Sequence, residues 1–228
     1  APSTVWQGAG RRIHMQEVGL RDGLQMEKAF VPTENKIALC NALSAAGLSK
    51  IEVTSFTSPT AIPALRDAEI VMREIERRPG VVYTALVPNM RGAERAIESK
   101  TDELNLVMSA SETHNLANLR MTRAQSFASL AQVVGMAQAA NVEVNVSLSC
   151  VFGCPMEGDV AEAEVFGLVQ RFADLGVGGI TLCDTTGMAY PSQVAHTPAA
   201  ARARWPGMGV TLHFHTTRGV GLAKVLAA

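Results

Sequence analysis

The sequence predicts a single-domain protein of the α/β class, a (β/α)₈ barrel whose eighth strand is missing from the 228 residues. Three observations predict this fold. Seven short apolar runs alternate with amphipathic stretches, a pattern of repeated strand–helix units. The runs are interrupted only by short polar residues, as expected for a parallel sheet that helices cover. No glycine-rich phosphate loop follows the first run, which argues against an open, doubly wound sheet.

Each expected element follows from the local pattern. Strands are predicted at residues 13–20, 50–54, 81–87, 103–108, 142–149, 178–183 and 209–214. Helices are predicted at residues 34–46, 62–77, 90–98, 120–140, 160–175 and 192–204, and a seventh in the residues after the last strand. The first helix illustrates the reasoning: Thr33 can cap its start, Ile37, Cys40 and Leu43 recur on one face, and Gly47 ends it.

The predicted domain boundaries leave residues 1–12 as an N-terminal extension and 13–228 as the barrel, incomplete at its C-terminus. A seven-stranded barrel would expose the unpaired edges of its first and seventh strands, which favours aggregation. We therefore expect the intact protein to continue for about 60–80 residues beyond Ala228, including the eighth strand, given the usual size of this fold. A protein that ends at Ala228 is expected to be poorly soluble and inactive.

The composition excludes several classes of protein. Twenty basic and twenty-one acidic residues nearly balance, and no basic cluster indicates binding to nucleic acid or to a membrane surface. No apolar run approaches the about 20 residues of a membrane span, and no signal or transit peptide is seen. These features predict a cytoplasmic protein of bacterial type. Cys150 and Cys154 form a C-x₃-C pair, but no second pair of ligands accompanies them, so we expect reduced, structural cysteines.

Polar residues gather where the predicted strands end, which is where active sites of such barrels lie. They are Arg21, Asp22 and Gln25 after the first strand, Glu52 and Thr54 on the second, His114 after the fourth, Asp184 on the sixth, and His213 and His215 on the seventh. For His114, predicted in a loop, two interpretations stay open: it can approach a substrate or cap the loop.

The H-F-H spacing is informative because alternate residues of a strand point to the same face. His213 and His215 are therefore predicted to share the barrel mouth. Together with Asp22 they can supply three ligands to one divalent cation. The adjacent Arg21 can act on a substrate, or it can form an ordinary salt bridge with Asp22 in a turn.

Six segments, in matching order, resemble the 3-hydroxy-3-methylglutaryl-CoA (HMG-CoA) lyase family, part of the metal-dependent lyase and synthase superfamily built on the TIM barrel. They are "EVGLRDGLQMEK", "KIEVTSFTSP", "ALVPN", "CVFGCPMEG", "CDTTGMAYP" and "LHFHTTRG". The resemblance implies cleavage of HMG-CoA to acetyl-CoA and acetoacetate, as in leucine degradation and ketone-body formation. It also implies an acyl-CoA substrate, a divalent metal ion that is usually Mg²⁺ or Mn²⁺, and a chain that can assemble as a homodimer.

The resemblance also assigns roles. Asp22, His213 and His215 match the metal ligands of the family. Arg21 matches the arginine that stabilises negative charge developing on a substrate oxygen, and with Gln25 it is expected to bind substrate.

The resemblance assigns further catalytic roles to two acidic residues and to one of the metal ligands. Glu52 and Asp184 match acidic residues at the rim of the active site, and His213 is expected to take part in proton transfer. The family has a further Asn ligand and a cysteine in a glycine-rich loop, both beyond the seventh strand and outside this sequence. Thr216 departs from the Asn or Asp that is common after the second His.

Alternative functions remain open at this point. The alternatives built on the same barrel are a related acyl-CoA lyase, a 2-oxo acid aldolase and a condensing synthase. If the chain truly ends at Ala228, an inactive metal-binding module is the alternative from another class.

Overall fold

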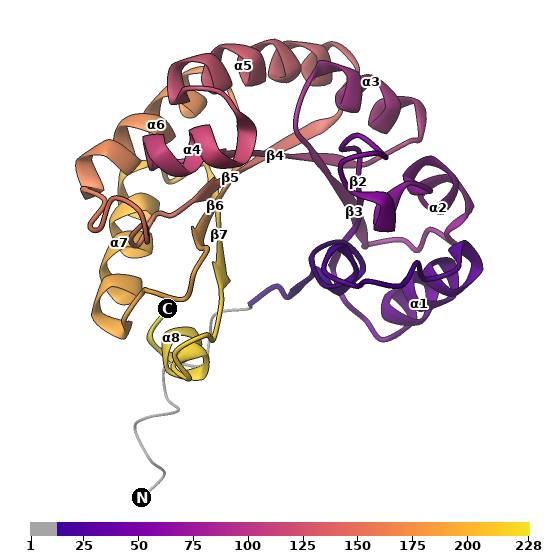
Figure 1. Ribbon diagram of the computed structural model, residues 1–228, viewed down its shortest axis with the longest axis horizontal. Coiled ribbons are helices and arrows are strands. Elements are labelled where there is room, and N and C mark those ends of the chain that lie inside the picture. The colour runs from indigo at the N-terminus through magenta and orange to yellow at the C-terminus, as the bar shows by residue number, and fades with distance from the viewer. Residues whose placement is uncertain (1–12) are drawn as a thin grey trace, which may run out of the picture.

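The computed structural model describes residues 13–228, and the expected N-terminal extension lies outside the described residues. The described residues form a parallel sheet of seven strands in sequential order, β1 to β7. The strands are β1 (Gln16–Glu17), β2 (Lys50–Ser55), β3 (Val82–Val87), β4 (Glu103–Ser109), β5 (Glu143–Ser149), β6 (Gly179–Asp184) and β7 (Gly209–Phe214). The sheet curls into an arc with helices on its convex side (Figure 1). This is the incomplete barrel that the sequence predicts.

Helices connect the strands. They are η2 (Gly19–Gly23), α1 (Thr33–Ala45), η3 (Pro63–Leu65), α2 (Ala68–Glu74), α3 (Met90–Glu98), α4 (Glu112–Leu119), α5 (Arg123–Ala139), α6 (Glu162–Asp174), α7 (Pro191–Arg204) and α8 (Gly221–Ala227). Six of the predicted strands and most helices agree with these bounds to within one or two residues.

Two parts of the prediction are wrong. The first strand covers only Gln16–Glu17, and η2, a π-helix, replaces the predicted strand end. Only two residues of this segment pair with β2, and Ile13, at the predicted start of the strand, is 81% exposed. The loop predicted after the fourth strand contains α4, which begins where the Ser111 side chain accepts a hydrogen bond from the backbone N–H of His114.

Along each strand, apolar and polar side chains alternate between the two faces of the sheet more regularly than the sequence suggests. In β5, Val144, Val146 and Leu148 belong to the core between the sheet and its helices. Asn145 and Ser147 point the other way and hydrogen-bond within the concave side. Both faces are buried, so the sequence reads as almost continuously apolar although one face is polar. The concave side therefore carries polar groups toward the strand ends.

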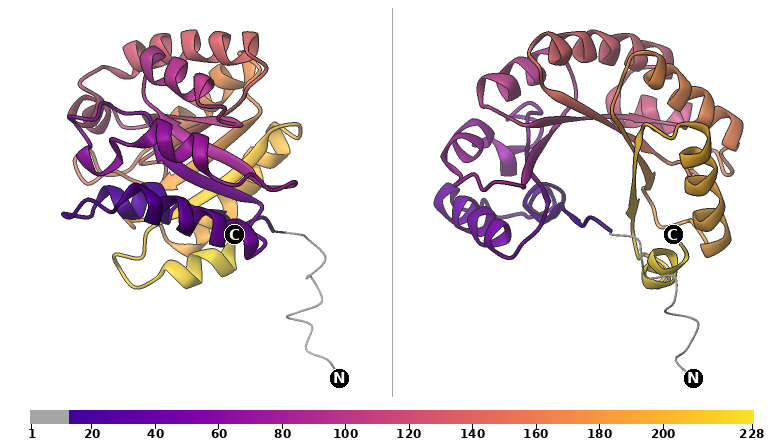
Figure 2. Two further views of the ribbon diagram at one scale, coloured as in Figure 1. Left: turned by 90° about the vertical axis from the view of Figure 1, so that its right-hand side faces the viewer. Right: turned by 180° about the vertical axis from the view of Figure 1, so that it is seen from behind.

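The two ends of the strand order lie on the open side of the arc, where β7 approaches the segment after β1 (Figure 2). The side chains of Asp22, which follows β1, and of His213, which lies on β7, come within 3.6 Å of each other. No helix in the described part of the chain has the length and apolar character needed to cross a membrane.

Candidate active site and metal centre

The π-helix η2 places Arg21 and Asp22 side by side at the mouth of the barrel. The backbone N–H groups of both residues donate to the carbonyl oxygen of Val18, at 3.1 and 2.7 Å. The wider turn buries the Arg21 side chain and leaves Asp22 partly exposed. π-helical turns often occur at functional sites, because they redirect side chains that a regular element would place elsewhere.

His213 on β7 and His215, just after the strand ends at Phe214, share one face, as the alternation predicts. The rings of His213 and His215 stack with their centroids 5.0 Å apart and their planes 15° apart. Phe214, between them, packs against the hydrophobic core. The strand thus holds two imidazoles side by side at its end.

Asp22, His213 and His215 converge from opposite ends of the sheet. One ligand atom from each lies within 4.8 Å of the others, a spacing at which one metal ion can reach all three. Within residues 13–228 no other group of histidine, cysteine, aspartate or glutamate side chains meets this description. Two imidazoles and a carboxylate suit a divalent cation, so the donor set fits the metal that the resemblance implies.

Burial keeps His213 in the form that can bind a metal. Desolvation lowers the pKa of His213, and the carboxylate of Asp22 only partly opposes this effect. The imidazole is therefore mainly neutral near pH 7, with a lone pair free for a ligand bond.

Glu52, on β2, is buried against Arg21 and does not line the cavity that Arg21 lines. Its side chain is 1% exposed and holds Arg21 in place, since the Arg21 Nε–H donates to Glu52 Oε2 at 2.8 Å. The Asn105 amide donates to Glu52 Oε1 at 2.6 Å. Arg21 Nη1–H also donates to Asp22 Oδ1 at 2.8 Å. The guanidinium is thereby fixed between a buried carboxylate and a candidate metal ligand.

Asp184, the last residue of β6, lies at the strand end but is buried there. It is 2% exposed, and the Lys224 ammonium donates to Asp184 Oδ2. The backbone N–H of Ala189 donates to Asp184 Oδ1 at 3.0 Å. Lys224 Nζ–H also donates to the carbonyl oxygen of His215 at 2.6 Å. The pair thus ties α8 and the turn after β6 to the backbone of a candidate ligand.

A tight turn completes this connection. Gly187 has φ +72°, and a Cβ atom there would meet Thr217 Oγ1 at 2.0 Å. The Thr217 hydroxyl donates to the carbonyl oxygen of Thr186 at 2.7 Å. Glycine is therefore required in the "CDTTG" segment, where the chain after β7 approaches the turn after β6.

We expect Lys224→Met to destabilise the fold by about 3–5 kcal/mol, because it leaves the buried Asp184 carboxylate without its cation. The free energy of unfolding in urea measures this loss. Lys28→Met removes an exposed lysine and should change the free energy by no more than about 0.5 kcal/mol. Equal stability of Lys224→Met and the unmodified protein would show that the pair does not hold the fold.

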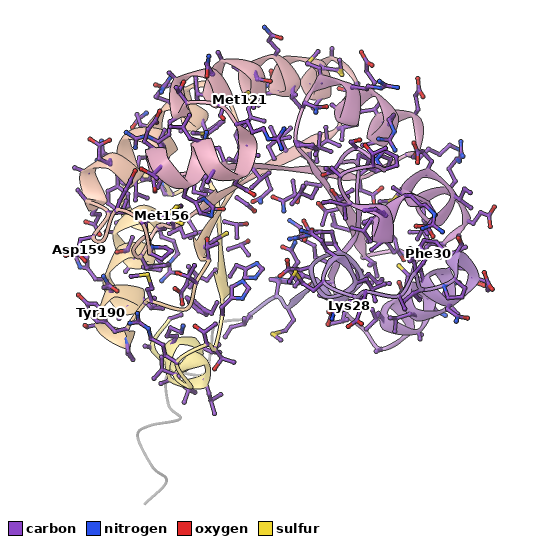
Figure 3. The ribbon with its side chains drawn as sticks, viewed as in Figure 1. Lys28, Phe30, Met121, Met156, Asp159 and Tyr190 are labelled. Carbon is purple, nitrogen blue, oxygen red and sulfur yellow. The ribbon has the colours of Figure 1, made fainter. Side chains whose placement is uncertain are left out.

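A cavity of about 500 Å³ opens at the mouth. Its lining includes Arg21, Asp22, Gln25, His114, Cys183, His213 and His215. Gln25, predicted from the sequence to bind substrate, therefore faces the same space as the candidate metal ligands, whereas Glu52 and Asp184 do not line it. Figure 3 shows the side chains on both sides of the arc, with Lys28 and Phe30 labelled on the α1 side and Met156 and Tyr190 on the α7 side.

All four cysteines are free thiols, and the Cys150–Cys154 pair belongs to no candidate metal cluster among residues 13–228. Burial raises the pKa of the Cys150 thiol to about 11. Burial also acts to raise the pKa of Cys154, but hydrogen bonds led by that from the Ser111 hydroxyl bring it below its ordinary value. The Ser111 oxygen lies 3.1 Å from Cys154 Sγ. The structural role expected for the pair stays a prediction.

Sequence reasoning missed Asn105 and Lys224. Each acts through a partner far along the chain, Glu52 and Asp184 respectively, so no local pattern marks either one. The start of α4 did carry a signal, because Ser111 precedes "ETHN" in the position of a helix cap.

Comparisons with known proteins identify the family of this chain. A family model described as HMGL-like matches residues 12–228. The chain is 46% identical to hydroxymethylglutaryl-CoA lyase of Bacillus subtilis over 96% of its length, and the match covers 73% of that protein. It is 37% identical to the human mitochondrial hydroxymethylglutaryl-CoA lyase, covering 96% of this chain and 67% of the relative.

A solved structure adds a ligand. The HMG-CoA lyase of Acinetobacter baumannii, in complex with coenzyme A and 3-methylmalate, is 50% identical to this chain with a TM-score of 0.89. The match covers 94% of this chain and 70% of that one.

Proposed function

This chain belongs to the HMGL-like family, and from that premise we propose that it is a divalent-metal-dependent HMG-CoA lyase. The reaction breaks one carbon–carbon bond of HMG-CoA and yields acetyl-CoA and acetoacetate. The relatives that match 96% of the chain are named hydroxymethylglutaryl-CoA lyases. They favour this reaction over a 2-oxo acid aldolase, a condensing synthase or a lyase for another acyl-CoA.

One observation carries the proposal: Asp22, His213 and His215 come together in the cavity that Arg21 also lines. These three side chains would hold the cation, Mg²⁺ or Mn²⁺. When bound, such an ion supplies positive charge that favours ionisation of the tertiary hydroxyl of the substrate.

The side chains of this chain supply two of the remaining requirements of the reaction. The hydroxyl must lose its proton, the carbon–carbon bond must break, and the electron pair must pass to the thioester fragment as an enolate, which then takes up a proton. We propose that His213 takes part in the proton transfer through the ring nitrogen that does not face the cation. Arg21 can stabilise negative charge on a substrate oxygen, because Glu52 and Asp22 fix its guanidinium in place.

Glu52 and Asp184 are proposed to act through other residues. Glu52 sets the orientation of Arg21, and Asp184 with Lys224 sets the backbone position of His215. Gln25 lines the cavity and is proposed to contact the substrate. The coenzyme A found in the Acinetobacter enzyme supports an acyl-CoA as the substrate of this chain.

Turnover of HMG-CoA tests the proposal directly. The intact protein, supplied with Mg²⁺ or Mn²⁺, should release equal amounts of acetyl-CoA and acetoacetate. Chelation should abolish the reaction, and re-addition of the cation should restore it. A 2-oxo acid aldolase substrate, offered in parallel, should give no product. The proposal fails if HMG-CoA persists unchanged in the presence of either ion.

A further inference from the structure

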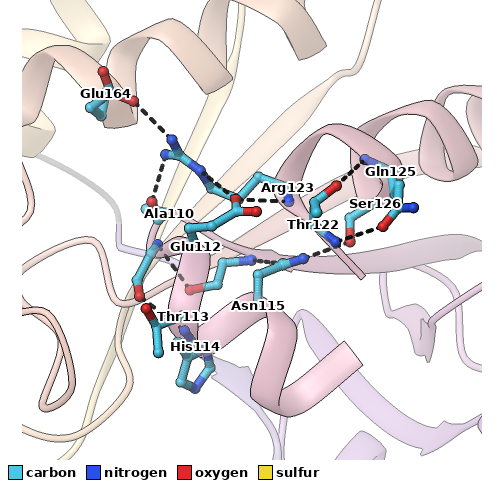
Figure 4. Close-up of polar contacts among 12 residues, drawn as sticks. Ala110, Glu112, Thr113, His114, Asn115, Thr122, Arg123, Gln125, Ser126 and Glu164 are labelled. Carbon is cyan, nitrogen blue, oxygen red and sulfur yellow. Dashed lines mark hydrogen bonds and ion pairs between the residues drawn. The ribbon is translucent and has the colours of Figure 1, made fainter. Parts of the chain in front are cut away.

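The helix α4 is fixed over the barrel mouth by buried polar contacts (Figure 4). Asn115 is fully buried: its Oδ1 accepts from the backbone N–H of Ser109 at 2.9 Å, and its amide donates to Met121 O at 2.8 Å and to Ser126 Oγ at 2.7 Å. Arg123 donates to the carbonyl oxygen of Ala110 at 2.8 Å. The backbone at both ends of the helix is therefore held to β4 and α5.

His114 precedes Asn115, and its ring takes no part in this network. No dashed contact reaches the ring in Figure 4. Among the described residues, its Nδ1 is buried without a hydrogen-bond partner. The ring lines the cavity that also contains Arg21, Asp22 and His213. The anchored helix thus places a histidine in the substrate cavity with no partner from the chain itself.

The chemical form of His114 follows from its surroundings. Burial lowers its pKa, and the carboxylate of Glu157 only partly opposes this, so the ring is mainly neutral near pH 7. Nδ1 is enclosed, which leaves Nε2 as the nitrogen accessible from the cavity. An acyl-CoA presents oxygen acceptors, so a useful contact requires the proton on Nε2, and this tautomer also avoids an unpaired buried N–H at Nδ1.

The order of the strands decides which substrate oxygen His114 can meet. His114 follows β4, the middle strand, whereas the candidate metal ligands follow β1 and lie on β7, the two ends of the order. The curl of the sheet therefore sets His114 across the mouth from the cation and from Arg21. If the cation takes the tertiary hydroxyl, the thioester can extend from it toward the wall that carries His114.

We propose that His114 is a further catalytic residue, whose Nε2–H donates a hydrogen bond to the thioester carbonyl oxygen of the bound acyl-CoA. This rests on the lyase function proposed above. When the carbon–carbon bond breaks, its electron pair moves into the thioester fragment and charge accumulates on that oxygen. A donor already in place stabilises the charge, and loss of one such donor typically lowers kcat by about 10²–10³-fold.

The test compares His114→Phe with His114→Gln, which keeps a donor, in the metal-loaded intact protein. With HMG-CoA as the probe, His114→Phe should lower kcat by at least about tenfold at little change in KM, and His114→Gln should recover part of the loss. Bound metal and Tm should match the unmodified protein. His196→Phe, at an exposed histidine on α7, is the matched control and should keep full activity.

The outcomes separate this inference from the lyase function. An unmodified protein that does not turn over HMG-CoA overturns the function, and with it the role of His114. An active protein whose His114→Phe variant keeps kcat overturns the His114 role alone, as does a rise in KM at constant kcat. His114→Leu repeats the measurement if the phenylalanine ring prevents folding, with the same expected loss of kcat.

Discussion

Asp22→Asn is expected to lose both the bound divalent cation and HMG-CoA cleavage. Asp22 supplies the only carboxylate of the candidate cluster in the described part of the chain, and a neutral amide cannot offset the charge of the ion. Loss of an outer contact to a metal ligand typically costs about 10–100-fold in affinity or activity, so loss of a ligand should cost more. His215→Ala should behave in the same way.

Metal content by mass spectrometry and kcat with saturating Mg²⁺ measure both effects. Asp159→Asn is the matched control, because Asp159 is an exposed carboxylate in the loop between β5 and α6 (Figure 3). It should retain the cation and full activity. An Asp22→Asn variant with unchanged metal content and kcat would remove Asp22 from the metal centre.

Arg21→Lys is expected to lower kcat by about 10²–10³-fold while the metal content stays intact. The guanidinium of Arg21 spans two carboxylates, with Nε–H directed to Glu52 and Nη1–H to Asp22, both at 2.8 Å. A lysine ammonium is a single point of charge and cannot keep both contacts while still facing the substrate. Because lysine keeps the positive charge, the variant tests whether catalysis needs the two-pronged geometry of the guanidinium.

Single-turnover rates and metal content, measured on the same preparation, test this expectation. Arg171→Lys is a suitable control, since the Arg171 guanidinium lies 3.6 Å from the centroid of the Phe127 ring on the outer helices. It should leave kcat unchanged. If Arg21→Lys lowers only Tm and kcat is kept, the arginine is a structural salt-bridge partner of Asp22, the alternative that the sequence left open.

The alternation of apolar runs and amphipathic stretches determined most of the fold. Strands β2 to β7 lie within one or two residues of their predicted positions, because a strand that helices cover must be apolar whatever its neighbours are. The H-x-H spacing likewise determined that His213 and His215 share a face. These features are local, and local periodicity is visible in the sequence.

Only the tertiary structure decided what the acidic residues do. At the level of sequence, Glu52, Asp184 and Asp22 are all carboxylates near predicted strand ends. In the fold, Glu52 pairs with Arg21 across 31 residues and Asp184 pairs with Lys224 across 40, whereas Asp22 faces the cavity. A buried carboxylate requires a cation beside it, and that cation can come from anywhere in the chain.

The π-helix and α4 were decided in the same way. Local pattern extended β1 to residue 20, but only two residues pair with β2, and the turn that follows buries Arg21 while it exposes Asp22. His114 gained its place in the cavity because Asn115, its neighbour, bonds to three separate segments. Side-chain burial and long-range pairing depend on the tertiary fold. Sequence periodicity therefore locates the strand ends, and tertiary contacts decide which residues there face the cavity.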